Sequence, residues 1–193
     1  MNFCSHCGQP VTIMIPPDDD RMRHVCTECN TVHYLNPKVV AGCIPVHADR
    51  VLLCKRAIDP RAGYWTLPAG FMELGETSLE AAVRETLEEA QARVQVQDLY
   101  AVFNLPHVNQ VYMMFRSSLL DLEFAPGRES TEVRLFAESG IPWPDLAFAT
   151  IRQTLTFYFE DRRNGRFPLH FGDILKKGNT YSFRARPSGS DTE

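Results

Sequence analysis

Five glutamates crowd into fourteen residues near the middle of the chain, and this crowding constrains the fold more than any other feature. They are Glu76, Glu80, Glu85, Glu88 and Glu89. Thr77 and Glu80 have the spacing of a capping box, in which each residue satisfies a free backbone N–H at the start of a helix. We therefore expect a helix that starts near Ser78 and ends at Ala90.

This helix has an apolar stripe and an acidic patch. At about 100° per residue, the stripe consists of Leu79, Val83, Thr86, Leu87 and Ala90. Glu85, Glu88 and Glu89 form the patch on roughly the opposite side. Like charges on one helix turn destabilise each other, and no lysine compensates them here. Since carboxylate oxygens are the ligands that Mg²⁺ prefers, the patch predicts a divalent metal site rather than a solvated helix face.

Two Cys-x-x-Cys pairs stand near the N-terminus, Cys4 with Cys7 and Cys26 with Cys29, and eighteen residues separate the pairs. This spacing is typical of a zinc ribbon. Four thiolates make a closed tetrahedral site, which is structural rather than catalytic. We therefore expect a module of residues 1–35 whose folding depends on Zn²⁺, because so small a module buries little core. Two disulfides, or scattered free thiols, are the alternative interpretation.

The pattern between and after the pairs supports the ribbon. Residues 11–15 and 22–25 are predicted to be short strands joined by a turn. Gly8 follows the first pair and Asn30 the second, and both residue types tolerate the left-handed conformation of tight turns.

The rest of the chain is predicted to mix strands with a second helix. The expected strands are residues 39–46, 51–56, 94–96, 99–105, 109–120 and 129–136. The second helix is expected from Asp145 to about Arg163, where Asn164-Gly165 ends it. We assign residues 36–165 to the main domain and 166–193 to a weakly patterned C-terminal extension, whose last seven residues are expected to be disordered.

Composition limits the classes of partner. The net charge of −4 and the pI of about 5.9 argue against nucleic-acid binding through phosphate contacts. No apolar run is long enough for a membrane span, and the N-terminus lacks the features of a secretory signal. Cysteines at metal-site spacing indicate the reducing cytoplasm. Cys43 and Cys54 fall in apolar runs, and we expect them to be small core residues.

The central stretch resembles the Nudix box, G-x5-E-x7-R-E-U-x-E-E-x-G-U, where U is a bulky aliphatic residue. The positions in register are Gly70, Glu76, Arg84, Glu85, Glu88 and Glu89. Thr86 and Ala92 replace aliphatic residues of the pattern, and Gln91 replaces its glycine. The resemblance implies an α+β fold, the Nudix α/β/α sandwich, behind the zinc-ribbon module.

A four-cysteine ribbon before a Nudix domain resembles the NADH pyrophosphatase group and its relatives. The chain is more similar to ribbon-bearing Nudix proteins that act on FAD and ADP-ribose. That similarity includes residues 3–29, 36–38, 67–70, 125–127 and 146–148. The S-Q-P-W-P-F-P-type motif of NADH-cleaving enzymes is not matched, because Pro142-Trp143-Pro144 lies fifty residues past the box and lacks the rest.

The resemblance assigns roles to particular residues. It implies that Mg²⁺ or Mn²⁺ binds Glu85, Glu88, Glu89, the Ala69 carbonyl and, from a later strand, Glu132. Arg84 would orient a glutamate through charge-assisted hydrogen bonds, while Glu76 and Gly70 support the loop. The candidates for substrate contact are Tyr34, Arg56, Phe71, Phe103 and Tyr112. For each aromatic residue, core packing is the alternative.

The implied reaction is hydrolysis of the diphosphate bond of a nucleoside diphosphate derivative to two monophosphates. FAD and ADP-ribose are the favoured substrates. Metal ions would neutralise the diphosphate and activate a water, and a glutamate or metal-bound hydroxide would take the proton. NADH pyrophosphatase activity, or removal of an NAD cap from RNA, is the second hypothesis, and a nucleotide-sensing binding module is the third. The resemblance also suggests a homodimer.

Overall fold

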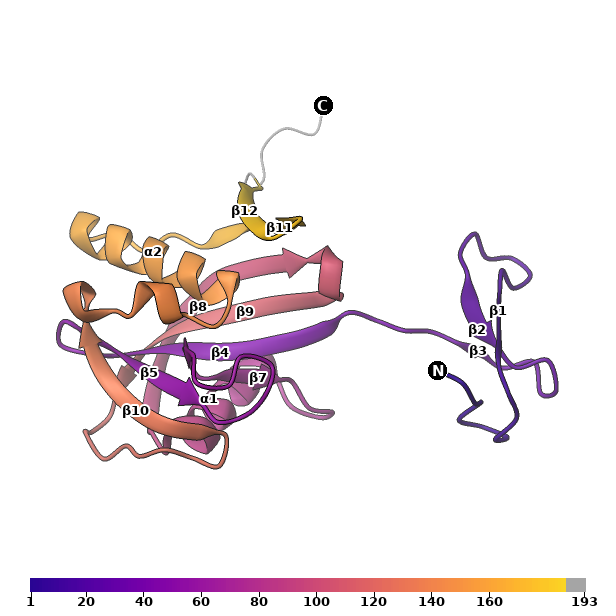
Figure 1. Ribbon diagram of the computed structural model, residues 1–193, viewed down its shortest axis with the longest axis horizontal. Helices are drawn as coiled ribbons and strands as arrows, with labels where there is room; N and C mark the ends of the chain where they lie inside the picture. Colours follow the sequence, from indigo (N-terminus) through magenta and orange to yellow (C-terminus); the bar gives the residue numbers. More distant parts are fainter. Residues whose placement is uncertain (187–193) are drawn as a thin grey trace. The chain divides into compact units, whose positions relative to one another are not determined.

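The computed structural model describes residues 1–186, which form two compact units (Figure 1). The first unit is Met1–Pro37, and the second begins at Lys38. Each unit has a sheet of its own. The expected disorder of the last seven residues concerns positions outside the described part of the chain.

The first unit is a three-stranded antiparallel sheet in the order β1-β2-β3. Its strands are β1 (Thr12–Met14), β2 (Arg23–Val25) and β3 (Val32–His33). The two turns that follow the cysteine pairs contain Gly8 at φ +78° and Asn30 at φ +56°. Both turns therefore use the left-handed conformation that their residue types favour.

A mixed sheet forms the centre of the second unit, in the strand order β10-β5-β4-β9-β8-β11-β12 (Figure 1). The strands are β4 (Lys38–His47), β5 (Arg50–Arg56), β8 (Val94–Leu105), β9 (Gln110–Leu119), β10 (Ser130–Ala137), β11 (His170–Lys177) and β12 (Thr180–Ala185). Two short strands, β6 (Trp65–Thr66) and β7 (Ala69–Phe71), pair with β5 and β4. The pairs β4–β9 and β8–β11 are parallel. Residues 94–105, expected as two strands, form one strand with two register shifts against β9.

Helices α1 (Ser78–Ala90) and α2 (Ala149–Asn164) cover opposite faces of this sheet. Neighbouring residues of a strand point to opposite faces. Ile44 packs in the same cluster as Leu155 of α2, whereas Cys43 packs with Ala81 and Ala82 of α1. The sheet thus lies between two helical layers, which confirms the predicted α/β/α sandwich.

Helix α1 begins as predicted, and its buried face includes only part of the predicted stripe, Thr86 and Ala90. Thr77 and Glu80 form the complete capping box. The buried side chains, however, are Ala81, Ala82, Thr86, Glu89 and Ala90. Leu79 and Leu87 of the predicted stripe are 46% and 51% exposed. The alanines allow close packing on the sheet, where the Cys43 thiol lies 3.5 Å from the Ala82 carbonyl oxygen, and this rotates the larger residues outward.

The C-terminal region is more regular than its sequence indicates. Helix α2 starts at Ala149, not at Asp145, which lies in a separate turn of 3-10 helix (Trp143–Asp145). Gly165 ends α2 at φ +65°. Residues 166–186, expected to be weakly patterned, contain β11 and β12, and β11 pairs in parallel with β8 of the main sheet. The C-terminal region therefore forms a β-hairpin, in place of the weakly patterned extension that the sequence predicts.

Candidate active site and metal centres

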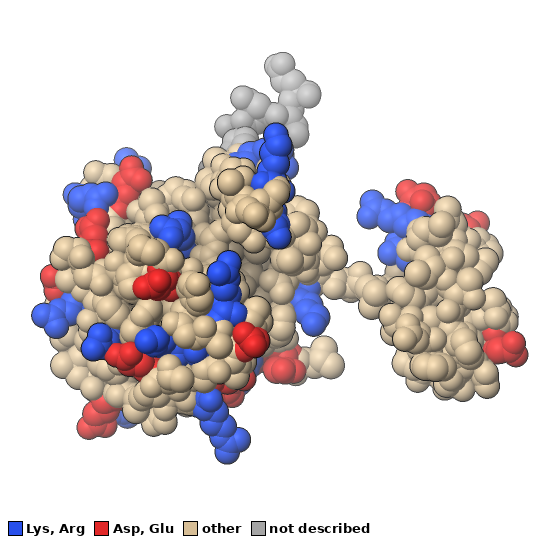
Figure 2. Space-filling view, viewed as in Figure 1, with Lys and Arg blue, Asp and Glu red and all other residues tan. Residues whose placement is uncertain are grey.

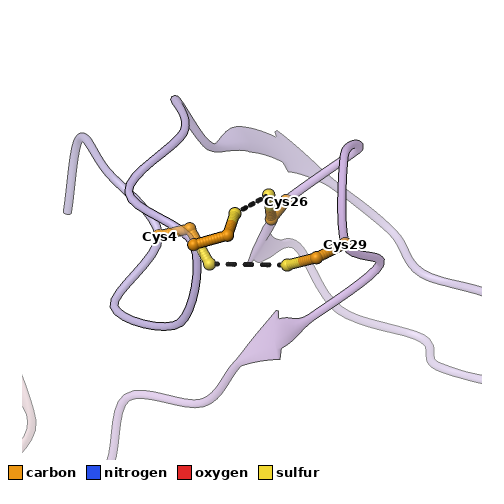
Figure 3. A group of neighbouring side chains, drawn as sticks. Cys4, Cys26 and Cys29 are labelled. Atoms are coloured by element: carbon orange, nitrogen blue, oxygen red, sulfur yellow. Dashed lines mark hydrogen bonds between the residues drawn. The ribbon is translucent and has the colours of Figure 1, made fainter.

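The four cysteines of the first unit lie together (Figure 3). Their sulfur atoms are all within 4.8 Å of one another, with Cys4 and Cys29 at 3.7 Å and Cys7 and Cys26 at 3.5 Å. All four thiols are free, so the disulfide interpretation does not apply. The grouping fits a tetrahedral ion with four sulfur ligands.

Two side chains that the sequence did not point to lie against these sulfurs. The His33 Nε2 atom is 3.3 Å from the Cys4 sulfur, and the Thr31 hydroxyl is 3.1 Å from the Cys29 sulfur. Both come from the segment that follows the second cysteine pair. Hydrogen bonds to thiolate sulfurs stabilise their negative charge and orient them toward a metal.

In the second unit, Arg84 of α1 holds the loop that precedes the helix. Its Nε donates to Glu76 Oε2 at 3.0 Å and its Nη2 to Glu76 Oε1 at 2.7 Å. The same Nη2 donates to the Phe71 carbonyl at 3.1 Å. These bonds lower the pKa of Glu76 to about 2. The box arginine therefore fastens β7 and the loop to the helix through a forked, charge-assisted contact.

Arg84 also positions two glutamates of the acidic patch. Its Nη1 donates to Glu85 at 2.7 Å and to Glu88 at 3.0 Å. Glu85 lies so close to Gly70 that a Cβ there would stand 2.3 Å from the Glu85 carboxylate. A side chain at position 70 would displace this carboxylate from its position, and glycine leaves the space for it.

Glu89 is the most buried of the patch glutamates, at 5% exposure. Its Oε2 accepts a hydrogen bond from the Ala69 backbone N–H at 3.1 Å. Burial raises the pKa of Glu89 to about 8, and the nearby charge of Glu85 contributes to the rise. Through this hydrogen bond, Glu89 links α1 to the start of β7.

A cavity of about 1470 Å³ opens beside these residues. Its lining includes the carboxylates of Glu85, Glu88, Glu89 and Glu129. Glu129 was not a candidate in the sequence, where we expected Glu132 to supply the acidic group. The structure places Glu132 away from the cavity lining, in ion pairs with Lys55 at 3.8 Å and Arg134 at 2.7 Å.

The expected substrate contacts divide into two groups. Arg56, Phe71 and Tyr112 line the cavity. Phe103 does not, because its side chain is fully buried in the core between the sheet and α2. Tyr34 belongs to the first unit, where the Arg23 guanidinium lies 5.0 Å from the centre of its ring.

The departures from the box keep its geometry. Gln91 adopts the left-handed conformation at φ +49°, and its side-chain amide donates to the Pro126 carbonyl at 3.1 Å. The Thr86 hydroxyl donates to the Ala82 carbonyl at 2.7 Å. Ala92 is buried in a small cluster with Leu52 and other apolar residues. Each substituted position has a local partner, so the backbone can follow the path of the motif.

Family comparisons agree with this geometry. The Nudix N-terminal ribbon family matches residues 2–35, and the NUDIX domain family matches residues 36–148. The chain therefore belongs to the Nudix hydrolase family. Relatives are named ADP-ribose pyrophosphatase and NAD-capped RNA hydrolase, and this chain is a Nudix hydrolase with an N-terminal ribbon.

Individual relatives refine the comparison. The crystal structure of a Nudix hydrolase from Nitrosomonas europaea is 57% identical, with a TM-score of 0.89, and the match covers 91% of this chain and all of the other. ADP-ribose pyrophosphatase of Methanocaldococcus jannaschii is 34% identical over 60% of this chain and 69% of its own. NAD-capped RNA hydrolase NudC of Edwardsiella ictaluri is 37% identical over 54% of this chain, but the match spans only 38% of NudC.

Two further observations concern partners. Among residues 1–186, no helix is long and apolar enough to cross a membrane. On the face that Figure 2 shows, acidic and basic side chains of the second unit are interspersed, and no continuous basic surface is visible there.

Proposed function

We propose that the enzyme hydrolyses the diphosphate bond of a nucleoside diphosphate derivative, with FAD or ADP-ribose as favoured substrate and Mg²⁺ or Mn²⁺ as the catalytic metal. The products are two monophosphates. The observation that carries this proposal is the cluster of Glu85, Glu88, Glu89 and Glu129 on the cavity lining. Divalent cations bound between this cluster and the substrate would offset the repulsion between the carboxylates and a diphosphate.

The residues present fit a divalent metal. Glu85, Glu88, Glu89 and Glu129 offer only hard oxygen ligands, which suit Mg²⁺ and Mn²⁺. The space at Gly70, which a Cβ would fill, leaves the Glu85 carboxylate accessible from the cavity. The Ala69 carbonyl remains a proposed ligand. We propose Glu129 rather than Glu132 as the acidic ligand from outside the helix, because Glu129 lines the cavity and Glu132 does not.

The residues of the site have separate roles in the proposed reaction. Arg84 holds Glu76, Glu85 and Glu88 in fixed positions. Glu129 lies beside them, and Glu89 contributes a buried carboxyl group whose raised pKa a bound cation would lower. When bound, the metal supplies charge neutralisation of the diphosphate and an activated water. A fixed constellation of ligands reduces the reorganisation that the reaction would otherwise require.

Other parts of the cavity suit a large nucleotide. Arginines also line the cavity and can pair with phosphate oxygens; they are Arg56, Arg61, Arg128 and Arg152. Aromatic rings are present at Phe71, Tyr112 and Phe148. The volume of about 1470 Å³ exceeds the range of roughly 300–1,000 Å³ that is usual for small-ligand pockets, so a two-part substrate fits.

A substrate panel tests this proposal. Purified protein is incubated with FAD, ADP-ribose and NADH at equal concentration with Mg²⁺, and the products are separated by chromatography. We expect AMP with FMN from FAD, or AMP with ribose 5-phosphate from ADP-ribose, at a higher kcat/KM than for NADH. A preference for NADH by about tenfold, which is worth about 1.4 kcal/mol, would overturn the substrate ranking.

NADH pyrophosphatase or NAD-cap hydrolysis is the second candidate, favoured by the similarity to NudC proteins. The third is a nucleotide-sensing module without turnover. Tight binding of ADP-ribose with no product formed would support the third and contradict the first. The full set of box glutamates favours an enzyme.

For the ribbon we propose a structural Zn²⁺ held by the four cysteines, in a protein of the reducing cytoplasm. The free thiols and their grouping support both statements. We also propose a homodimer, which analytical ultracentrifugation tests directly. A single species at 21.9 kDa, the mass of one chain, would contradict the dimer.

A further inference from the structure

The β11–β12 hairpin lies beyond the residues that match the NUDIX domain family, which end at 148. It joins the edge of the main sheet, where His170–Asp173 pair in parallel with Ala101–Asn104 of β8. Three residues of the hairpin line the same cavity as the glutamates: Ile174 on β11, Tyr181 on β12, and Asn179 in the turn between them. The hairpin therefore forms part of the substrate pocket.

The base of the hairpin is firmly attached to the sheet. The buried carboxylate of Asp173 accepts a hydrogen bond from the Asn104 side chain at 3.1 Å and one from Arg186 Nε at 2.9 Å. Gly172 has no room for a side chain, because a Cβ would stand 2.4 Å from the ring of Phe183. These contacts leave the hairpin little freedom to shift.

Phe183 adds an aromatic anchor at the same end. Its ring packs edge-to-face on Phe103 of β8 at 5.6 Å and on Phe157 of α2 at 5.1 Å. Such contacts bury large apolar area and favour a single arrangement. Since side chains two residues apart share a face of a strand, Phe183 also fixes the direction of Tyr181.

Tyr181 has a different environment from Phe183. Its side chain is 47% exposed, and its ring faces that of His107 at a centroid distance of 5.8 Å and an interplanar angle of 56°. His107 comes from the 3-10 turn Pro106–Val108 and also lines the cavity. Packing in the core accounts for the aromatic ring at Phe183. It does not account for the pair of Tyr181 and His107, because the Tyr181 ring is half exposed on the cavity lining.

We propose that Tyr181, with His107 and Asn179, forms the subsite that binds the aromatic base of the substrate. Exposed rings stack on planar heterocycles, and the side-chain amide of Asn179 can donate to or accept from a base edge. Tyr181 is in this account a specificity residue and takes no part in the chemical step. The inference rests on the proposed function, because it concerns the same cavity.

The test compares Tyr181→Ala and Tyr181→Phe with Ser182→Ala, which changes the neighbouring exposed residue that does not line the cavity. ADP-ribose is the substrate, since adenine is its only aromatic ring. For Tyr181→Ala we expect KM to rise about tenfold while kcat stays within about twofold, because stacking stabilises the bound ring and not the reacting bond. Tyr181→Phe should restore KM, and Ser182→Ala should match wild type.

Binding of AMP, measured by calorimetry without turnover, separates this inference from the proposed function. We expect Tyr181→Ala to weaken AMP binding about tenfold and ribose 5-phosphate binding by less than about twofold. An unchanged KM and AMP affinity in Tyr181→Ala, equal losses in Tyr181→Phe, or a wild type that does not bind AMP would overturn the subsite. A wild type that binds AMP but hydrolyses neither FAD nor ADP-ribose would instead overturn the proposed function and leave the subsite supported.

Discussion

Arg84 and Glu76 are joined by two parallel hydrogen bonds, Nε to Oε2 at 3.0 Å and Nη2 to Oε1 at 2.7 Å. The pair connects the middle of α1 to the loop that precedes it. Glu76 also accepts from the Glu73 backbone N–H at 2.6 Å, so one carboxylate secures both the turn and the arginine. Through Arg84, this contact sets the positions of Glu85 and Glu88.

Replacing Arg84 with lysine should lower kcat, because an ammonium group cannot reproduce the fork that holds Glu76 while also reaching Glu85 and Glu88. Loss of such a supporting contact costs roughly 10- to 100-fold in activity or metal affinity. Steady-state kinetics across a Mg²⁺ titration measures both. If Arg84→Lys keeps kcat within about twofold of wild type, the fork is not what positions the glutamates.

The two acidic residues near the start of β10 provide a matched comparison. Glu129→Gln should lower kcat by about tenfold or more, since Glu129 lies on the cavity wall with the box glutamates. Glu132→Gln should change kcat by less than about twofold, because its partners are Lys55 and Arg134. A larger effect at Glu132 than at Glu129 would restore the assignment made from the sequence.

Removal of Zn²⁺ should unfold the ribbon and spare the second unit. The ribbon exposes several large apolar side chains and has a small core, so the metal must supply much of its folding free energy. Hydrogen exchange by mass spectrometry on the full chain, with a zinc-selective chelator and Mg²⁺ in excess, follows both units. Cys26→Ser should reproduce the effect. Protection of residues 1–35 that survives zinc loss would show that the metal is not structural.

The attachment of the hairpin should depend on pH through Asp173. Hydrogen bonds from Asn104 and Arg186 lower the pKa of Asp173 below its usual 3.8. The native state then binds fewer protons than the unfolded state, so the contribution is complete well above pH 3.8 and is lost as the pH falls through the folded pKa.

The corresponding measurement is urea unfolding of wild type and Asp173→Asn at several pH values between 7 and about 3. Wild type should be more stable near neutrality, and the difference in the free energy of unfolding should shrink toward the acid end. A difference that stays constant over this range would mean that the charge of Asp173 does not contribute.

Local patterns in the sequence predicted the parts of the site that lie on one helix. The Thr77–Glu80 capping box marked the start of α1, and the spacing of the box residues placed Arg84 beside Glu85 and Glu88. Thr86 and Ala90 of the predicted apolar stripe are buried but Leu79 and Leu87 are not, because large apolar residues dominate a helical pattern whereas close packing here uses alanines.

Local sequence patterns did not predict features that depend on pairing between segments far apart in the chain. The resemblance implied Glu132 on β10 as the later acidic ligand, whereas Glu129, which directly precedes that strand, is the residue that lines the cavity. The pairing of β11 with β8 joins residues about seventy positions apart, such as His170 with Ala101, and no local pattern encodes it. Tyr181 and His107 meet only because of that pairing, and neither was a candidate in the sequence.

We assign diphosphate hydrolysis to the carboxylate cluster of Glu85, Glu88, Glu89 and Glu129. The most direct test is Glu89→Gln, which keeps the size of the side chain and removes its ability to ionise, measured with ADP-ribose and FAD at saturating Mg²⁺. Glu160→Gln, at an exposed position of α2, is the control. We predict that Glu89→Gln lowers kcat at least about 100-fold while Glu160→Gln stays within about twofold. Unchanged turnover in Glu89→Gln would contradict the assignment of the active site.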